Sequence, residues 1–163
     1  MTGQEIIISD QAHDLATTDL ERAGRAANHA AARHAFSEYQ DRKSENTLVA
    51  QRQALESFQA FLAKVGVQTG DLFTDPHAWR GVTWGLVKAF VNSLLQDGYS
   101  VATVNLRLST VKVYATLAAS AGAIDARELA LIKTVTGYRK REAKNIDKVR
   151  DTTRRGHKKA EWT

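Results

Sequence analysis

The sequence contains no cysteine, a single proline and no long apolar run. The absence of cysteine excludes a disulfide scaffold, a thiol nucleophile and metal sites built on thiolates. One proline argues against a β-sandwich or barrel, whose frequent turns need such residues. No run reaches the ~18 apolar residues of a membrane-spanning helix, and the N-terminus lacks the basic region of a signal peptide. We therefore expect a helical, cytoplasmic protein with no membrane partner.

Positive charge is concentrated at the C-terminal end of the chain. Residues 133–163 carry eleven Lys or Arg and four acidic residues, whereas residues 1–132 carry twelve and fourteen. The formal net charge of +5 therefore arises from the last fifth of the sequence. A basic segment of this kind suits a polyanion, and nucleic acid is the commonest one. A solvated tail without a partner is the alternative, because the segment has too few large apolar residues to enter a membrane surface.

Apolar spacing and capping residues predict an all-α fold, a bundle of four to five helices. Residues 10–43 are rich in alanine and favour a long helix. Further helices are expected over residues 44–66, 83–97, 100–122 and 125–132, each opened by Ser, Thr or Asp. Three of these end at or close to a glycine. Residues 66–82 hold three glycines and the proline and are predicted to form a loop, with Trp79 as a plug at the edge of the core.

Three domains follow from this pattern. Residues 1–43 are an N-terminal, mainly helical extension, residues 44–137 form the helical domain, and residues 138–163 are a basic linker. Beyond about Gly137 large apolar residues become rare and charge rises, which places the second boundary.

Residues that would support catalysis or metal binding are sparse. None of the five histidines pairs with another at the spacing that puts two side chains on one helical face, and no phosphate-binding glycine loop occurs. We therefore expect no metal, no cofactor and no small-molecule substrate. Tyr138 is the one candidate nucleophile, since the neighbouring Arg139, Lys140 and Arg141 would favour its phenolate. We favour instead an aromatic anchor at the end of the last helix, and we do not expect this chain to be an enzyme.

Three stretches between residues 44 and 125 together form one pattern of helices. They are Ser44-Glu45-Asn46-Thr47 with Phe58 and Phe61-Leu62; Trp79, Val82-Thr83, Val87, Phe90 and Leu94 with Asp97-Gly98-Tyr99-Ser100; and Thr103-Val104-Asn105, Arg107-Leu108-Ser109, Val111, Tyr114, Ala118 and Gly122 with Ile124-Asp125. In their order and spacing they resemble the SAM-like core-binding domain of tyrosine recombinases, the phage-integrase family. The resemblance covers roughly residues 40–137.

The resemblance implies a helical domain that forms half of a C-shaped clamp around double-stranded DNA and is linked to a catalytic domain. That catalytic domain carries an Arg, a Lys, a His-x-x-Arg box and a late nucleophilic Tyr, and no such set follows the family-like stretch in residues 138–163. Tyr138 is too early to be this nucleophile. We therefore expect an N-terminal fragment of an integrase, whose parent protein is a site-specific tyrosine recombinase.

Residues at the starts of two helices, off the apolar stripes and in the basic linker are candidates for DNA contact. Free amides at a helix N-terminus favour phosphate, and polar side chains beside them reach the backbone or a groove. We expect Asn105 and Arg107 to make contact without supporting the fold. On the Ser44 helix, Arg52 is nearly the only basic residue, which departs from the family pattern. The candidates are Ser44, Asn46, Thr47, Arg52, Ser100, Thr103, Asn105, Arg107, Lys112, Arg139, Lys140, Arg141 and Lys144.

Two further interpretations stay open. A helical protein-interaction module with a non-specific basic tail is the alternative to DNA binding. The resemblance also implies self-association on DNA through the N-terminal helix, because such helices often pack on a neighbouring protomer in this family. Its large apolar residues are Leu15, Leu20, Phe36 and Tyr39. These four either form that contact surface, or Phe36 and Tyr39 close the core while the first half of the helix projects into solvent.

Overall fold

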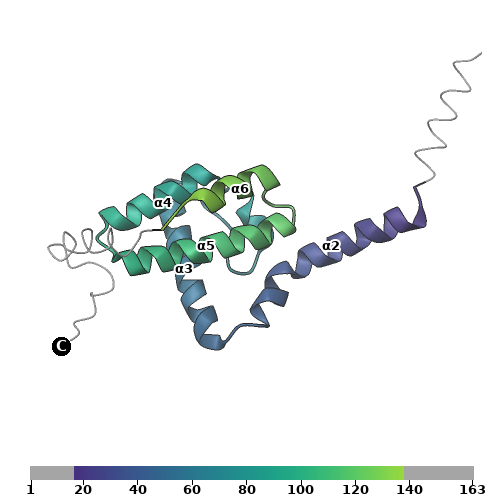
Figure 1. The fold of residues 1–163 in the computed structure, drawn as a ribbon, viewed down its shortest axis with the longest axis horizontal. Helices are drawn as coiled ribbons and strands as arrows, with labels where there is room; N and C mark the ends of the chain where they lie inside the picture. Colours follow the sequence, from purple (N-terminus) through teal and green to yellow (C-terminus); the bar gives the residue numbers. More distant parts are fainter. Residues whose placement is uncertain (1–16, 138–163) are drawn as a thin grey trace, which may run out of the picture.

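The computed structural model describes residues 17–137. Within this range the chain is all-helical and contains no strand, which confirms the predicted fold class. The elements, drawn in Figure 1, are α2 (Asp19–Gln40), α3 (Glu45–Lys64), the 3-10 helix η1 (Pro76–Trp79), α4 (Trp84–Gln96), α5 (Val101–Ser120) and α6 (Ala126–Thr134).

Local capping chemistry determines where these helices begin and end. Ser44, Thr83, Ser100 and Asp125 each precede a helix, and each side chain accepts a hydrogen bond from the backbone N–H three residues later. Such a bond satisfies one of the four amides that a helix start leaves without a partner. After α4, Gly98 adopts a φ of 85°, a left-handed conformation that terminates helices and favours glycine.

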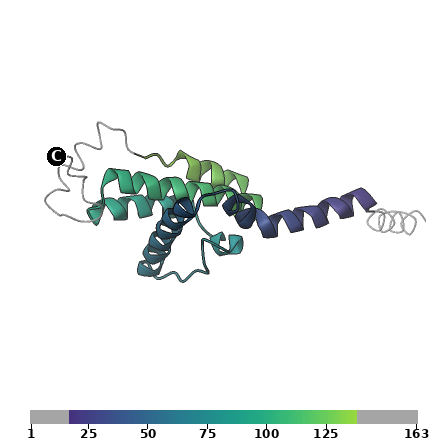
Figure 2. The same ribbon diagram turned by 90° about the horizontal axis from the view of Figure 1, so that it is seen from below.

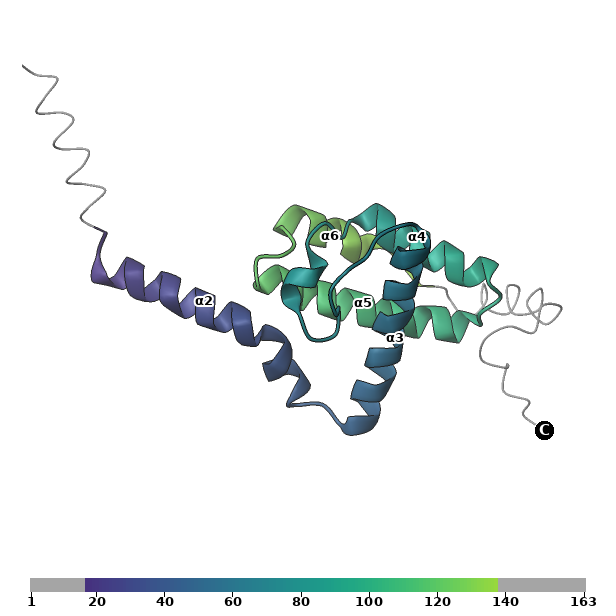
Figure 3. The same cartoon turned by 180° about the vertical axis from the view of Figure 1, so that it is seen from behind.

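The core is organised around α5, which packs against α2, α3, α4 and α6. In Figures 1 and 3, α4 and α6 run alongside α5, whereas α3 crosses it steeply. Because neighbours surround α5, its buried residues are not confined to one stripe, and Val104, Val111 and Tyr114 are all fully buried. Trp79 is also fully buried and donates its indole N–H to the carbonyl of Leu72 at 2.9 Å. It therefore lies inside the core, not at the edge where we expected it.

The end of α2 belongs to this core. Phe36 is 2% exposed, and its ring meets the ring of Tyr114 edge-on with the centroids 5.1 Å apart. Tyr39 is half-buried and meets the same ring at 5.7 Å. The core thus extends to before Ser44, where the sequence placed the start of the helical domain. Phe36 and Tyr39 therefore close the core, which is the second of the two alternatives that the sequence left open.

A buried polar network fastens the same end of α2 to α3 and α5. The Tyr114 hydroxyl donates to Oε1 of Gln51 and accepts from Nε2 of Gln40, both at 3.1 Å. Gln40 also donates to the Phe73 carbonyl, and Gln51 donates to the Tyr39 hydroxyl, both at 2.8 Å. Burial raises the pKa of the Tyr114 phenol, which keeps it neutral and able to donate.

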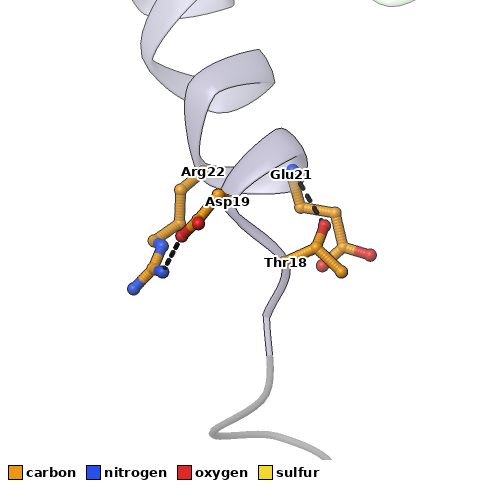
Figure 4. Close-up of polar contacts among 4 residues, drawn as sticks. All are labelled: Thr18, Asp19, Glu21 and Arg22. Atoms are coloured by element: carbon orange, nitrogen blue, oxygen red, sulfur yellow. Dashed lines mark hydrogen bonds and ion pairs between the residues drawn. The ribbon is translucent and has the colours of Figure 1, made fainter.

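The N-terminal part of α2, residues 19–33, extends away from the other helices in all three ribbon views (Figures 1, 2 and 3). We call these residues the arm. Thr18 caps the arm by accepting from the backbone N–H of Glu21 at 3.1 Å, and Arg22 forms an ion pair with Asp19 (Figure 4). Leu20 is 81% exposed, and Leu15 lies outside the described residues.

Candidate nucleic-acid interface

The start of α3 presents exposed hydroxyl and amide side chains. Ser44, Asn46 and Thr47 are all exposed. The Ser44 Oγ accepts from the backbone N–H of Thr47 at 3.2 Å and lies 2.9 Å from its Oγ1. Lys43 extends over the ring of Tyr39, with its Nζ 5.0 Å from the centroid. This helix end therefore combines the positive end of a helix dipole with a neighbouring cation.

Arg52 lies two turns along α3 and is held by an aromatic ring. Its guanidinium carbon lies 4.3 Å from the centroid of Phe73. The side chain is exposed and lines a shallow cavity of about 470 Å³ together with Glu56 and Asp71. These carboxylates oppose the positive charge of Arg52, just as Glu45 opposes the positive end of the dipole at the start of α3.

The start of α5 differs from the expectation. Ser100 is 5% and Thr103 is 8% exposed. Their hydroxyls lie 2.9 Å apart, and Ser100 accepts from the Thr103 backbone N–H at 3.2 Å. Because only four residues separate α4 from α5, the start of α5 packs against the end of α4. Our placement of Thr103 away from the apolar residues is therefore wrong, and both hydroxyls serve the cap.

Arg107 braces the crossing of α3 and α5. Its Nη1 donates to the Ser57 hydroxyl of α3 at 3.0 Å, and its guanidinium lies 4.4 Å from the centroid of Tyr99. Arg107 is half-buried. It does lie off the apolar stripe of α5, but it is not the free surface position that the sequence indicated, because it links two helices and a turn.

The chain leaving α6 runs along α5. The Lys112 ammonium donates to the Lys133 carbonyl at the end of α6 at 3.2 Å, and burial lowers the pKa of Lys112. Four residues later, a Cβ added to Gly137 would lie 2.5 Å from Oδ1 of Asn105. Lys112 and Asn105 are seven residues apart and so share a face of α5. The exit segment, residues 135–137, therefore runs antiparallel to α5 and ends beside Asn105.

The structure thus brings the candidates together in two groups. Ser44, Asn46 and Thr47 form one group at the exposed start of α3, with Arg52 two turns away. The second group lies along α5 and comprises Ser100, Thr103, Asn105, Arg107 and Lys112. Arg139, Lys140, Arg141 and Lys144 lie outside the described residues and follow Gly137 by two to seven positions. Sequence reasoning missed three partners, Phe73, Ser57 and Gly137, because each contacts its candidate across more than twenty residues of chain.

Comparison with known protein families identifies this helical domain. The family model for the phage integrase N-terminal SAM-like domain matches residues 34–122, which is 89 of the 163 residues. The chain belongs to this family. No curated protein and no solved structure matched the sequence.

The match covers the packed helices from the end of α2 to α5, whereas α6, whose Ile132 is fully buried in the same core, lies after it. The match begins in the turn of α2 that carries Phe36 and ends at Gly122, directly after α5. The arm lies before the matched residues, and α6 with the exit segment lies after them. The matched residues are therefore flanked by two features that the family match does not describe, of which α6 still packs on the core.

Two further properties of the described residues bear on function. Within residues 17–137, no group of three His, Asp or Glu side chains is arranged to hold a metal ion. None of the helices in that range is long and apolar enough to cross a bilayer.

Proposed function

We propose that this chain is the DNA-binding domain of a site-specific tyrosine recombinase and docks on a recombination half-site in double-stranded DNA. Membership of the phage-integrase family supports this function. The observation that carries it is the contact of Gly137 with Asn105. Because of this contact, the last described residue before the most basic stretch of the sequence lies beside Asn105 of α5.

Phosphate contacts would come from two places. The exposed start of α3 offers the hydroxyls of Ser44 and Thr47, the amide of Asn46 and the nearby Lys43 ammonium. The linker offers Arg139, Lys140, Arg141 and Lys144, whose charges bind phosphates without reading sequence. Arg107, Ser100 and Thr103 act in this scheme as supports, because their side chains are buried or half-buried and bonded within the domain.

Strand cleavage and joining belong to another domain of the parent recombinase in this proposal, so this chain by itself is not an enzyme. Its work is DNA recombination and integration, carried out in the cytoplasm at the nucleoid. Self-association on DNA through α2 remains part of the proposal. Of its four expected apolar residues, however, Phe36 and Tyr39 are used by the core, and Leu20 is the one exposed apolar contact that the described residues retain.

A salt titration of DNA binding tests the proposal. The logarithm of the association constant should fall steeply and linearly with the logarithm of the salt concentration. Changing Arg139, Lys140, Arg141 and Lys144 to Gln should flatten the slope by roughly 0.9 for each phosphate that the linker no longer neutralises. The matched control changes Lys64, Arg80, Lys88 and Arg127 to Gln, which removes the same charge from exposed positions within residues 17–137.

A flat titration of the wild-type chain would contradict the proposal and favour a protein-interaction module. Equal slopes for the linker variant and its control would show that the linker does not bind DNA.

A further inference from the structure

The arm carries a row of basic side chains on the helix face that continues from buried Phe36. Counting back from buried Phe36 in steps of three and four residues gives Arg33, His29, Arg25 and Arg22. Residues at this spacing share one face of a helix. All four are exposed, so the face that buries an aromatic ring at the end of α2 becomes a basic stripe along the arm.

Acidic residues weaken this stripe only at its first turn. Arg22 pairs with Asp19 (Figure 4), but the two side chains are 65% and 97% exposed. Exposed ion pairs of this kind are weak and are screened by salt, so a phosphate can compete for Arg22. Arg25, His29 and Arg33 have no ion-pair partner within residues 17–137.

The remaining surface of the arm offers little to an apolar partner. On the opposite side lie Leu20, Gly24, Ala27 and Ala31, of which only Leu20 is large. A membrane-binding helix needs a row of large apolar side chains, and a helix that packs on another protein needs a broad apolar stripe. Charge complementarity instead points to a polyanion, and the DNA that the domain is proposed to bind is a polyanion.

The spacing of the stripe matches a DNA groove. Arg25 and Arg33 are eight residues apart, which corresponds to ~12 Å along a helix axis. This is about the width of the major groove of B-DNA. Two guanidinium groups at that separation can bind phosphates on the two opposite edges of the groove, one group at each edge. Arginine binds a phosphate with two parallel hydrogen bonds.

We propose that the arm is a second DNA-contacting element, in which Arg25 and Arg33 bind phosphates of the duplex that the domain occupies. The inference rests on the proposed DNA-binding function and extends it to a part of the chain outside the family match. The arm is ~22 Å long, which is about six or seven base pairs of duplex. It therefore lengthens the footprint of the domain by that amount.

The test compares two variants of equal charge in the full chain. Arg25→Gln/Arg33→Gln changes the stripe while keeping a residue that favours helix. Arg80→Gln/Arg127→Gln is the control, since both residues are exposed and lie outside α2. The stripe variant should flatten the salt slope by ~1.8 more than the control, equivalent to two neutralised phosphates. The affinity of the wild-type chain should also keep rising over the last six or seven base pairs of a duplex length series, whereas that of the stripe variant should not.

The outcomes separate the two proposals. A wild-type chain that shows no salt-dependent binding contradicts the proposed function itself. A steep wild-type slope with identical stripe and control variants contradicts the arm contact alone. If the stripe variant keeps its slope but loses self-association in sedimentation, the arm binds a second copy and the DNA assignment of the stripe is wrong.

Discussion

The hydroxyl of Tyr114 is the polar centre of the contact between α2 and the rest of the domain, and a Tyr114→Phe variant removes it alone. The ring contacts with Phe36, Tyr39 and Phe73 persist, because phenylalanine has the same ring. Gln40 keeps its bond to the Phe73 carbonyl. Oε1 of Gln51 loses the Tyr114 donor, and the Gln51 side chain is 9% exposed, which leaves it little access to water.

The expected cost follows from that orphaned oxygen. A buried polar group without a partner destabilises the folded state by ~1–3 kcal/mol, so the free energy of unfolding should fall by that amount. Tyr39→Phe tests the other end of the Gln51 amide. It leaves the bond to Oε1 of Gln51 intact but removes the acceptor of Nε2, so it orphans a donor of the same buried side chain and should also cost ~1–3 kcal/mol. Adding Gln51→Leu to Tyr114→Phe should recover part of the loss, because both partners are then apolar.

Urea denaturation with linear extrapolation measures all of these variants. A Tyr114→Phe loss below ~0.5 kcal/mol, the range of ordinary surface substitutions, would contradict the reasoning. So would losses that simply add in the double variant, since groups in one network should be coupled.

The Tyr114 hydroxyl should also make the free energy of unfolding depend on pH. Burial raises the pKa of Tyr114, so its contribution to stability is complete below the unfolded value near 10 and is lost as pH rises through the folded value. The stability difference between wild type and Tyr114→Phe should therefore shrink in alkaline solution. A difference that stays constant above pH 10 would count against a buried neutral phenol.

Two further variants test the supports of α5. Arg107→Ala should lower the free energy of unfolding by ~1–2 kcal/mol, because it removes the Tyr99 stack and the Ser57 hydrogen bond. Adding Ser57→Ala should then lower the unfolding free energy in urea little further. Two fully additive losses would exclude this hydrogen bond. Gly137→Ala should displace the amide of Asn105 and lower the unfolding free energy by ~1 kcal/mol in urea denaturation. An unchanged unfolding free energy would mean that the two residues do not touch.

The helices and their ends could be predicted because their causes are local. Ser44 and Ser100 cap the helices that the sequence assigned to them, since each bonds to an amide three residues away. Glycine after α4 and α5 ends those helices for an equally local reason. The family resemblance rested on the same local pattern, and the comparison confirmed it.

The roles of individual side chains could not be predicted in this way. A single apolar stripe describes a helix with one covered face, but α5 is covered on several sides, so Thr103 and Thr110 are buried although a single stripe leaves them outside. Tyr114 and Gln51 are 63 residues apart in sequence, and nothing local to either indicates the other. Arg107 looked like a surface cation for the same reason.

The position of two contacts on α5 has a consequence for the geometry of the chain. Tyr114 fastens the end of α2, and Asn105 meets the exit segment. These residues are nine positions apart, or ~13 Å along the axis. One residue inserted between them would turn one contact relative to the other by ~100° and separate them by a further ~1.5 Å. The separation of Asn105 and Tyr114 along α5 therefore sets both the angle and the distance between the end of α2 and the exit segment.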